Sequence, residues 1–256
     1  MSLLQAGPLR VRTHGASSPA RPGDGPSIVL CHGFGAPGDD LVPLARVTDA
    51  GPATRWFFPE APLAVDELGQ ITPHITTMGP DHDEGRAWWP VDMLRLQMEL
   101  ARGARAWEPS ATPEGMPAAR GALVAALKAL VASGAIDPSR TILGGFSQGA
   151  MLTTDVALSA AETGMRFAGL AILSGAEINR ARWAAALERE GQALHVLQSH
   201  GRRDPLLPFG VAESLHRRLV AAGADATFLP FDGGHEIPRT VLLALGSFAR
   251  ATVQGR

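Results

Sequence analysis

Residues 141–150 read Thr-Ile-Leu-Gly-Gly-Phe-Ser-Gln-Gly-Ala, an apolar run followed by a serine between two glycines. The apolar run predicts a buried strand, and the periodicity that starts at Gln148 predicts a helix. A sharp turn from strand to helix brings the two backbones together and leaves no room for a Cβ at Gly145 or Gly149. In this setting G-x-S-x-G is typical of a nucleophile elbow, whereas a capping serine in a glycine-rich turn is the plainer alternative. We therefore predict that Ser147 is a catalytic nucleophile.

Apolar runs like this one alternate with helical periodicity along the rest of the chain. Several are apolar without alternation, as expected of parallel strands covered on both faces. The alternation predicts the α/β class with a doubly wound, mostly parallel sheet. The predicted strands are residues 9–13, 27–31, 55–58, 140–146, 167–173, 193–198 and 226–231, and the predicted helices are residues 117–133, 148–163, 179–190, 209–222 and 237–253.

The composition narrows the functional classes. The chain has 256 residues, of which 45% are apolar and 19% charged, so a single domain over residues 1–256 is expected. A net charge of −2 argues against a nucleic-acid partner. The single cysteine, Cys31, excludes an internal disulfide and a cysteine-based zinc site. No apolar run is long enough for a membrane span, so we expect a cytoplasmic protein, either a monomer or a homodimer.

Residues 60–116, called the excursion below, break the rhythm of strand and helix. This proline-rich stretch, with a helix predicted over residues 92–107, is expected to form either a lid or a wall of a pocket. Its run Asp81-His82-Asp83-Glu84 has metal-binding residue types, but a single such cluster is more often a solvated loop, and no metal is predicted. Trp88 and Trp89, with Leu206 and Leu207, are candidates for substrate binding, and core packing is the alternative for the same side chains.

A nucleophilic serine requires a general base, and the base requires an orienting carboxylate. Downstream of a nucleophile elbow the acid precedes the histidine. His235 lies in a glycine-rich loop between a predicted strand and a helix, and it is the predicted base. By contrast, His195 lies within an apolar run, and His216 lies in the middle of a predicted helix beside two arginines.

Asp204 is the predicted acid, because it follows the carboxyl end of a strand, where the ligands of open α/β sheets gather. Asp225 begins the next strand at the opposite edge. Asp232 is a competitor close to the base, although next to Gly233 it is also a typical turn former. His200 is expected to brace the Asp204 loop, with a catalytic role as the alternative.

The developing oxyanion of an acyl-transfer reaction requires hydrogen-bond donors. One predicted donor is the backbone N–H of Gln148, the residue after the nucleophile. The second is the backbone N–H of Phe34, in the glycine-containing loop that follows the strand over residues 27–31. His32 is then expected to brace this loop, and Cys31 to be a small buried apolar residue.

The chain resembles the phospholipase/carboxylesterase family of α/β-hydrolases, which includes acyl-protein thioesterases and small bacterial carboxylesterases. The resemblance lies in His32-Gly33-Phe34-Gly35, Phe58-Pro59-Glu60-Ala61-Pro62, Ala87-Trp88-Trp89, Gly145-Phe146-Ser147-Gln148-Gly149, His200-Gly201 followed by Asp204, and Gly234-His235. It implies the α/β-hydrolase fold, a triad of Ser147, Asp204 and His235, oxyanion donors at Phe34 and Gln148, a small-molecule ester substrate and no cofactor.

The sequence departs from the family pattern in four places. Ala36-Pro37 replaces a frequent aspartate, Ala150 a frequent glycine and Trp89 a frequent phenylalanine, and residues 90–116 form a long segment for an acyl-protein thioesterase. These departures favour a hydrolase of small or aryl esters. The predicted function is therefore a serine hydrolase that cleaves carboxylic esters through an acyl-enzyme. The alternatives are an acyl-protein thioesterase or lysophospholipase, and a non-catalytic binding protein with a hydrolase fold.

Overall fold

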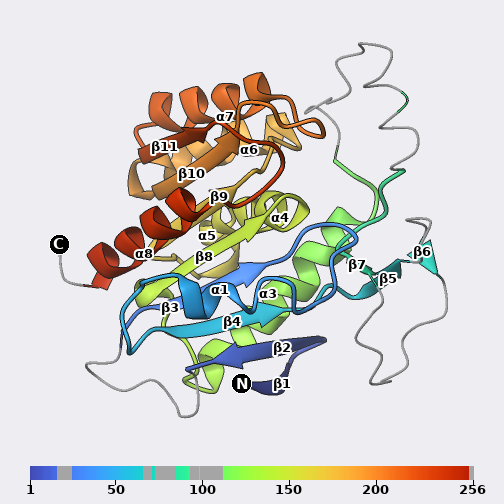
Figure 1. The fold of residues 1–256 in the computed structure, drawn as a ribbon, viewed down its shortest axis with the longest axis vertical. Helices are drawn as coiled ribbons and strands as arrows, with labels where there is room; N and C mark the ends of the chain where they lie inside the picture. Colours follow the sequence, from blue (N-terminus) through green and yellow to red (C-terminus); the bar gives the residue numbers. More distant parts are fainter. Residues whose placement is uncertain (16–24, 66–70, 73–84, 93–97, 99–111, 254–256) are drawn as a thin grey trace.

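The computed structural model describes residues 1–15, 25–65, 71–72, 85–92, 98 and 112–253 (Figure 1). Its centre is an eight-stranded sheet in the order β1-β2-β4-β3-β8-β9-β10-β11. The strand β2 pairs antiparallel with β1 and β4, and every other neighbouring pair is parallel. The predicted doubly wound, mostly parallel sheet is confirmed. The strands are β1 Ser2–Ala6, β2 Leu9–His14, β3 Ser27–Cys31, β4 Arg55–Pro59, β8 Thr141–Phe146, β9 Gly169–Leu173, β10 His195–Gly201 and β11 Asp225–Phe231.

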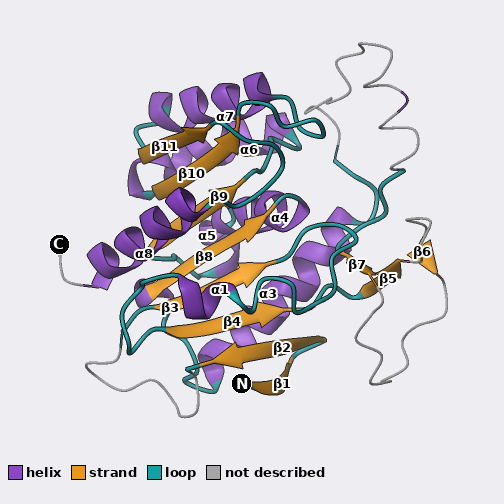
Figure 2. Cartoon of the chain, in the orientation of Figure 1, coloured by secondary structure: helices purple, strands orange, loops and turns teal. Residues whose placement is uncertain are grey.

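Helices cover both faces of this sheet (Figure 2). The helices are α1 Leu44–Val47, α3 Met116–Ala132, α4 Gln148–Ala157, α5 Ala160–Thr163, α6 Arg180–Glu190, α7 Phe209–Ala221 and α8 Arg239–Val253, with 3₁₀ turns η1 Pro138–Arg140 and η2 Gly191–Ala193. Because successive strand side chains point to opposite faces, β3 contributes Ile28 and Leu30 to the core under α1 and α8. It contributes Val29 and Cys31 to the larger core under α3, α4, α6 and α7.

The structure differs from the predicted elements at several places, which include the short helix α1. The strand β1 was not predicted, because this short edge strand is mostly exposed and lacks a clear apolar alternation. The predicted helix over 148–163 is interrupted between α4 and α5, where the Ser159 hydroxyl donates to the carbonyl of Asp155. The strand β10 runs on to Gly201, so His200 lies in the strand rather than in the following loop.

The described part of the excursion contains a second, small antiparallel sheet in the order β6-β5-β7. Its strands are β5 Leu63–Val65, β6 Ile71–Thr72 and β7 Gly85–Ala87, none of which was predicted. Most of the predicted helix 92–107 and the acidic run 81–84 lie outside the described residues. A lid-like role of the excursion stays a prediction. No helix in the described part of the chain has the length and apolar character to cross a membrane.

Candidate active site

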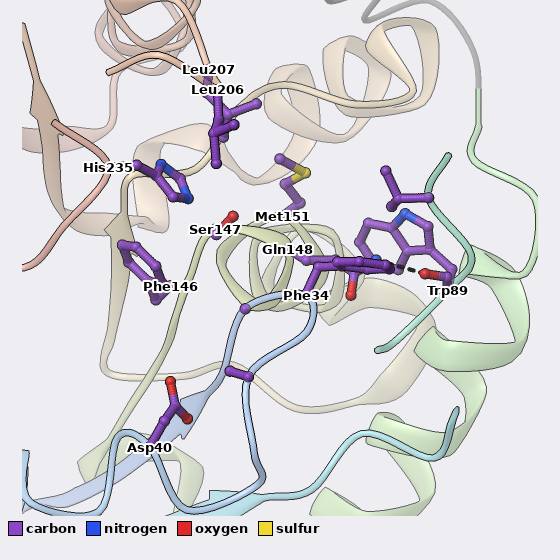
Figure 3. Close-up of a pocket in the computed structure, with 13 residues that line it drawn as sticks. Phe34, Asp40, Trp89, Phe146, Ser147, Gln148, Met151, Leu206, Leu207 and His235 are labelled. Atoms are coloured by element: carbon purple, nitrogen blue, oxygen red, sulfur yellow. Dashed lines mark hydrogen bonds between the residues drawn. The ribbon is translucent and has the colours of Figure 1, made fainter. Parts of the chain in front are cut away.

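Ser147 occupies the sharp turn between β8 and α4. Its backbone has φ 54° and ψ −118°, a conformation that L-residues adopt only where the surroundings impose it. A Cβ on Gly145 would lie 2.4 Å from the carbonyl carbon of Gly149, and one on Gly149 would lie 2.2 Å from the carbonyl oxygen of Cys31. Both glycines are therefore required by backbone contacts. The turn directs the Ser147 side chain into a pocket (Figure 3).

His235 and Asp204 come together at the carboxyl ends of β10 and β11. The Nδ1 atom of His235 lies 2.6 Å from Asp204 Oδ2. The other carboxylate oxygen of Asp204 accepts the backbone N–H groups of Leu206 and Leu207, each at 2.9 Å. Burial alone would raise the pKa of Asp204, but the hydrogen bonds from His235 and from the Leu207 backbone hold this pKa below its ordinary value. Asp204 is thus an ionised, fully hydrogen-bonded partner for His235.

The loops that carry Asp204 and His235 are in direct contact. The backbone N–H of Arg202 donates to the carbonyl of Phe231 at 2.9 Å, and that of Arg203 donates to the carbonyl of Gly233 at 2.9 Å. A Cβ on Gly201 would lie 2.0 Å from the carbonyl oxygen of Gly234. Glycine at position 201 therefore allows the close approach that brings the two loops together.

The other candidate acids and bases lie in different settings. His200 is fully buried, and its Nε2 atom lies 2.8 Å from the carbonyl of Leu207 and 3.3 Å from Asp204 Oδ2, so it braces the Asp204 loop as expected. Asp232 is exposed and pairs with Arg203. At the other end of β10, His195 contacts Asp225. The remaining downstream candidate, His216, stacks on the ring of Phe228.

Residues 33–36 form a loop that approaches Ser147. A Cβ on Gly33 would lie 3.3 Å from the Cβ of Ser147. The loop is fixed by a bridge to β7, because Gly35 N–H donates to Arg86 O at 2.8 Å and Arg86 N–H donates to Ala36 O at 3.0 Å. Phe34 and Gln148 both line the pocket. Gln148 is also the first residue of α4, where backbone N–H groups lack partners within the helix.

The side chain of His32 holds this loop in place by hydrogen bonds. Its Nε2 atom accepts the backbone N–H of Ala61 at 3.0 Å, so Nδ1 carries the proton and donates to the carbonyl of Gly33 at 2.8 Å. Burial lowers the pKa of His32 to about 4, and the ring is neutral at pH 7. Burial also raises the pKa of the neighbouring Cys31 thiol, which argues against a nucleophilic role for it.

The neutral His32 predicts a specific acid sensitivity. In the unfolded chain this histidine is protonated below about pH 6.5, whereas in the folded chain it stays neutral down to about pH 4. The free energy of unfolding therefore falls as the pH is lowered through this window. The expected loss is about 3 kcal/mol in the free energy of unfolding. Urea denaturation of the wild type and of His32→Gln at a series of pH values should show this loss in the wild type only. Parallel pH dependences of the two proteins would contradict it.

The pocket is a cavity of about 160 Å³ with a mainly apolar wall. Trp89, Leu206 and Leu207 line it, but Trp88 does not. The Trp88 side chain is buried behind the wall, where its indole N–H donates to the carbonyl of His32 at 3.0 Å. The lining residues are Gly33, Phe34, Ala36, Asp40, Trp89, Val91, Phe146, Ser147, Gln148, Met151, Leu206, Leu207 and His235 (Figure 3).

Sequence reasoning missed several of these lining residues. Met151 lies one helical turn after Ser147, a spacing that could have placed it at the same mouth. No spacing in the sequence points to Asp40 or Val91. In the described part of the chain, no three His, Cys, Asp or Glu side chains are grouped to hold a metal ion.

Comparison with known proteins gives a family and a set of similar structures. Residues 103–253 match the sequence profile of the phospholipase/carboxylesterase family. The comparison with curated proteins gives no match.

Among solved structures, esterase PE8 is 27% identical, with 99% of this chain and 100% of the other covered at a TM-score of 0.65. Acyl-protein thioesterase 2 of Zea mays is 20% identical, and the match covers 94% of this chain and 98% of the other at a TM-score of 0.68. A carboxylesterase of Mesorhizobium loti is 16% identical, and the match covers 100% of this chain and 99% of the other at a TM-score of 0.65. These similarities confirm the fold class predicted from the sequence.

Proposed function

The chain belongs to the phospholipase/carboxylesterase family, and from this premise we propose that it is a serine hydrolase that cleaves carboxylic esters through an acyl-enzyme. One observation carries the proposal. At the pocket that holds Ser147, the Nδ1 atom of His235 lies 2.6 Å from Oδ2 of Asp204, whose other carboxylate oxygen accepts two backbone N–H groups. Membership of the family makes the chain a hydrolase that acts on esters. The roles of the individual residues are the proposed part.

In the proposed acylation step, the Ser147 hydroxyl attacks the ester carbonyl carbon while His235 Nε2 takes the hydroxyl proton. Asp204 stabilises the imidazolium that forms, because its carboxylate stays ionised and accepts a hydrogen bond from the Nδ1–H group of His235. The carbonyl oxygen becomes an oxyanion that accepts the N–H groups of Phe34 and Gln148. The intermediate collapses when the C–O bond breaks and the leaving alcohol takes the proton from His235.

In the proposed deacylation step, water replaces the alcohol. His235 removes a proton from the water as it attacks the acyl carbon, and a second oxyanion forms in the same place. The intermediate then breaks the bond to Ser147 Oγ, which recovers its proton from His235, and the carboxylic acid leaves. The start of α4 assists both steps, because the helix dipole places positive potential at the oxyanion. This chemistry requires no cofactor.

A profile over chain length tests the function. We expect the wild-type protein to hydrolyse p-nitrophenyl esters, with the rate depending on acyl length from acetate to octanoate. Matched oxygen and sulfur esters separate a carboxylesterase from an acyl-protein thioesterase, and lysophosphatidylcholine tests for a lysophospholipase. The family departures noted above favour the short oxygen esters. A folded protein that turns over none of these substrates would be the non-catalytic binding protein instead.

Two statements about the whole chain belong to the same proposal. We place residues 1–256 in one domain, because the oxyanion loop after β3 and the His235 loop after β11 serve a single site. We also place the protein in the cytoplasm, which fractionation of the source cells would test. Size-exclusion chromatography with light scattering would decide between monomer and homodimer.

A further inference from the structure

The side chain of Gln148 is bound to the excursion. Its Oε1 atom accepts the backbone N–H of Trp88 at 2.8 Å, and its Nε2 group donates to the carbonyl of Trp89 at 2.8 Å. The second of these bonds is drawn in Figure 3. Gln148 is 3% exposed, so both hydrogen bonds are shielded from water. The Gln148 amide thus binds one backbone group from each of two successive residues of the excursion, the N–H of Trp88 and the C=O of Trp89.

The backbone that Gln148 holds carries a wall of the pocket. Trp89 lines the pocket together with Ser147 and Gln148, and the residue is 2% exposed. On its other side Trp89 packs against the start of α3, where a Cβ on Gly115 would lie 3.3 Å from the Cβ of Trp89. Trp89 therefore has two supports, the start of α3 against its Cβ and the Gln148 amide at its backbone carbonyl. Of these two supports, the amide is the one attached to the nucleophile turn.

We propose that the side chain of Gln148 is a specificity-determining positioning residue, which sets the distance of the Trp89 wall from Ser147 and so the size of the substrate group that the pocket admits. The inference rests on the proposed esterase function and adds to it. A side-chain amide has one acceptor and two donor hydrogens, as the N–H and C=O of the excursion require. A methionine of similar volume would leave a buried N–H and a buried C=O unpaired, and the segment would move to find other partners.

A double-mutant cycle tests whether Gln148 acts through Trp89. The four proteins are the wild type, Gln148→Met, Trp89→Ala and the double variant. The readout is the ratio of kcat/KM for p-nitrophenyl hexanoate to that for p-nitrophenyl acetate, because general damage to the chemistry affects both esters alike. We expect Gln148→Met to change this ratio by about tenfold in the wild type. In the Trp89→Ala background it should change the ratio by less than about twofold, because the wall is already absent.

A second variant separates hydrogen bonding from volume. In Gln148→Glu, a protonated carboxyl has one donor and one acceptor and can bind both backbone groups, whereas the ionised carboxylate cannot donate to Trp89. The selectivity ratio of this variant should therefore match the wild type at low pH and approach that of Gln148→Met at high pH. The wild-type ratio should stay constant, because both esters use the same His235. A role in filling space alone would give no pH dependence, and this arm decides the matter if Gln148→Met does not fold.

Gln198→Met is the matched control. Gln198 is also a buried glutamine, and its amide donates to the carbonyl of Ala212 on α7, outside the pocket lining. Its replacement should leave the selectivity ratio unchanged. The inference would be overturned if Gln148→Met left the selectivity ratio unaltered. It would also be overturned if Gln148→Met and Trp89→Ala changed this ratio by independent factors that multiply in the double variant. In either case the esterase function would stand. Failure of the wild type to hydrolyse either ester would instead overturn the proposed function, and this inference with it.

Discussion

Replacing Ser147 by alanine should lower kcat/KM for p-nitrophenyl acetate by about 10⁶-fold, because the members of a catalytic triad act as one unit. The substitution removes the oxygen that attacks the ester and leaves His235 without a proton to accept. The turn itself should survive. Serine already adopts the positive φ of 54° at this position, so alanine adds no new backbone strain, and the neighbouring glycines still allow the close backbone contacts. Steady-state hydrolysis and thermal unfolding measured on the same preparation check both parts.

Ser159→Ala is the control for this prediction. Ser159 is a buried serine between α4 and α5, where its hydroxyl donates to the carbonyl of Asp155 at 2.7 Å. Its removal should cost about 1 kcal/mol of stability and leave kcat/KM within about twofold of the wild type. A Ser147→Ala protein that is as active as the Ser159→Ala protein would show that Ser147 is not the nucleophile.

Replacing Asp204 by asparagine should lower kcat by about 10⁴-fold, the loss that the same change causes in a serine-protease triad. The reason lies in the hydrogen bonds of this carboxylate. Because Leu206 and Leu207 donate to one oxygen, the amide oxygen of asparagine would take that place and its NH₂ group would face His235. The imidazole would then accept at Nδ1 and carry its proton on Nε2, where it cannot take the proton of Ser147.

Asp232→Asn tests whether any nearby carboxylate would serve. Asp232 is three residues from His235 in the sequence, but its side chain is exposed and pairs with Arg203. Its substitution should change kcat by less than about twofold, as expected for an exposed ion pair. If Asp204→Asn retained a tenth of the wild-type kcat, or if Asp232→Asn lost more activity than Asp204→Asn, Asp204 would not be the acid of the triad.

The features that could be predicted from the sequence are those that local chemistry encodes. The elbow is predictable because Gly145 and Gly149 flank Ser147 in the sequence, and the backbone contact that requires Gly145 comes from Gly149, four residues away. The central strands are predictable because burial on both faces leaves a continuous apolar run, as in β3 and β9. The candidate acid and base, Asp204 and His235, are predictable because they lie in loops after the carboxyl ends of strands and in the order expected downstream of a nucleophile elbow.

The features that escaped prediction depend on contacts distant in the sequence. Trp88 and Trp89 are adjacent and chemically alike, yet one is buried behind the pocket wall and the other lines the pocket. Their difference is set by the carbonyl of His32 and the amide of Gln148, which are 56 and about 60 residues away along the chain. The small sheet of the excursion was missed because its strands span only two or three residues each.

Fluorophosphonate labelling followed by peptide mass spectrometry tests the central claim, that Ser147 is an activated nucleophile, most directly. The reagent reacts rapidly with a serine whose hydroxyl is activated by a neighbouring general base, and the serine oxygen displaces fluoride from phosphorus. Trypsin should release residues 141–166 as one peptide that contains both Ser147 and Ser159, and fragmentation distinguishes the two serines. We predict a single adduct on Ser147, formed more slowly in Asp204→Asn and absent in Ser147→Ala. A protein that hydrolyses esters but carries its adduct on another residue, or no adduct at all, would contradict the account.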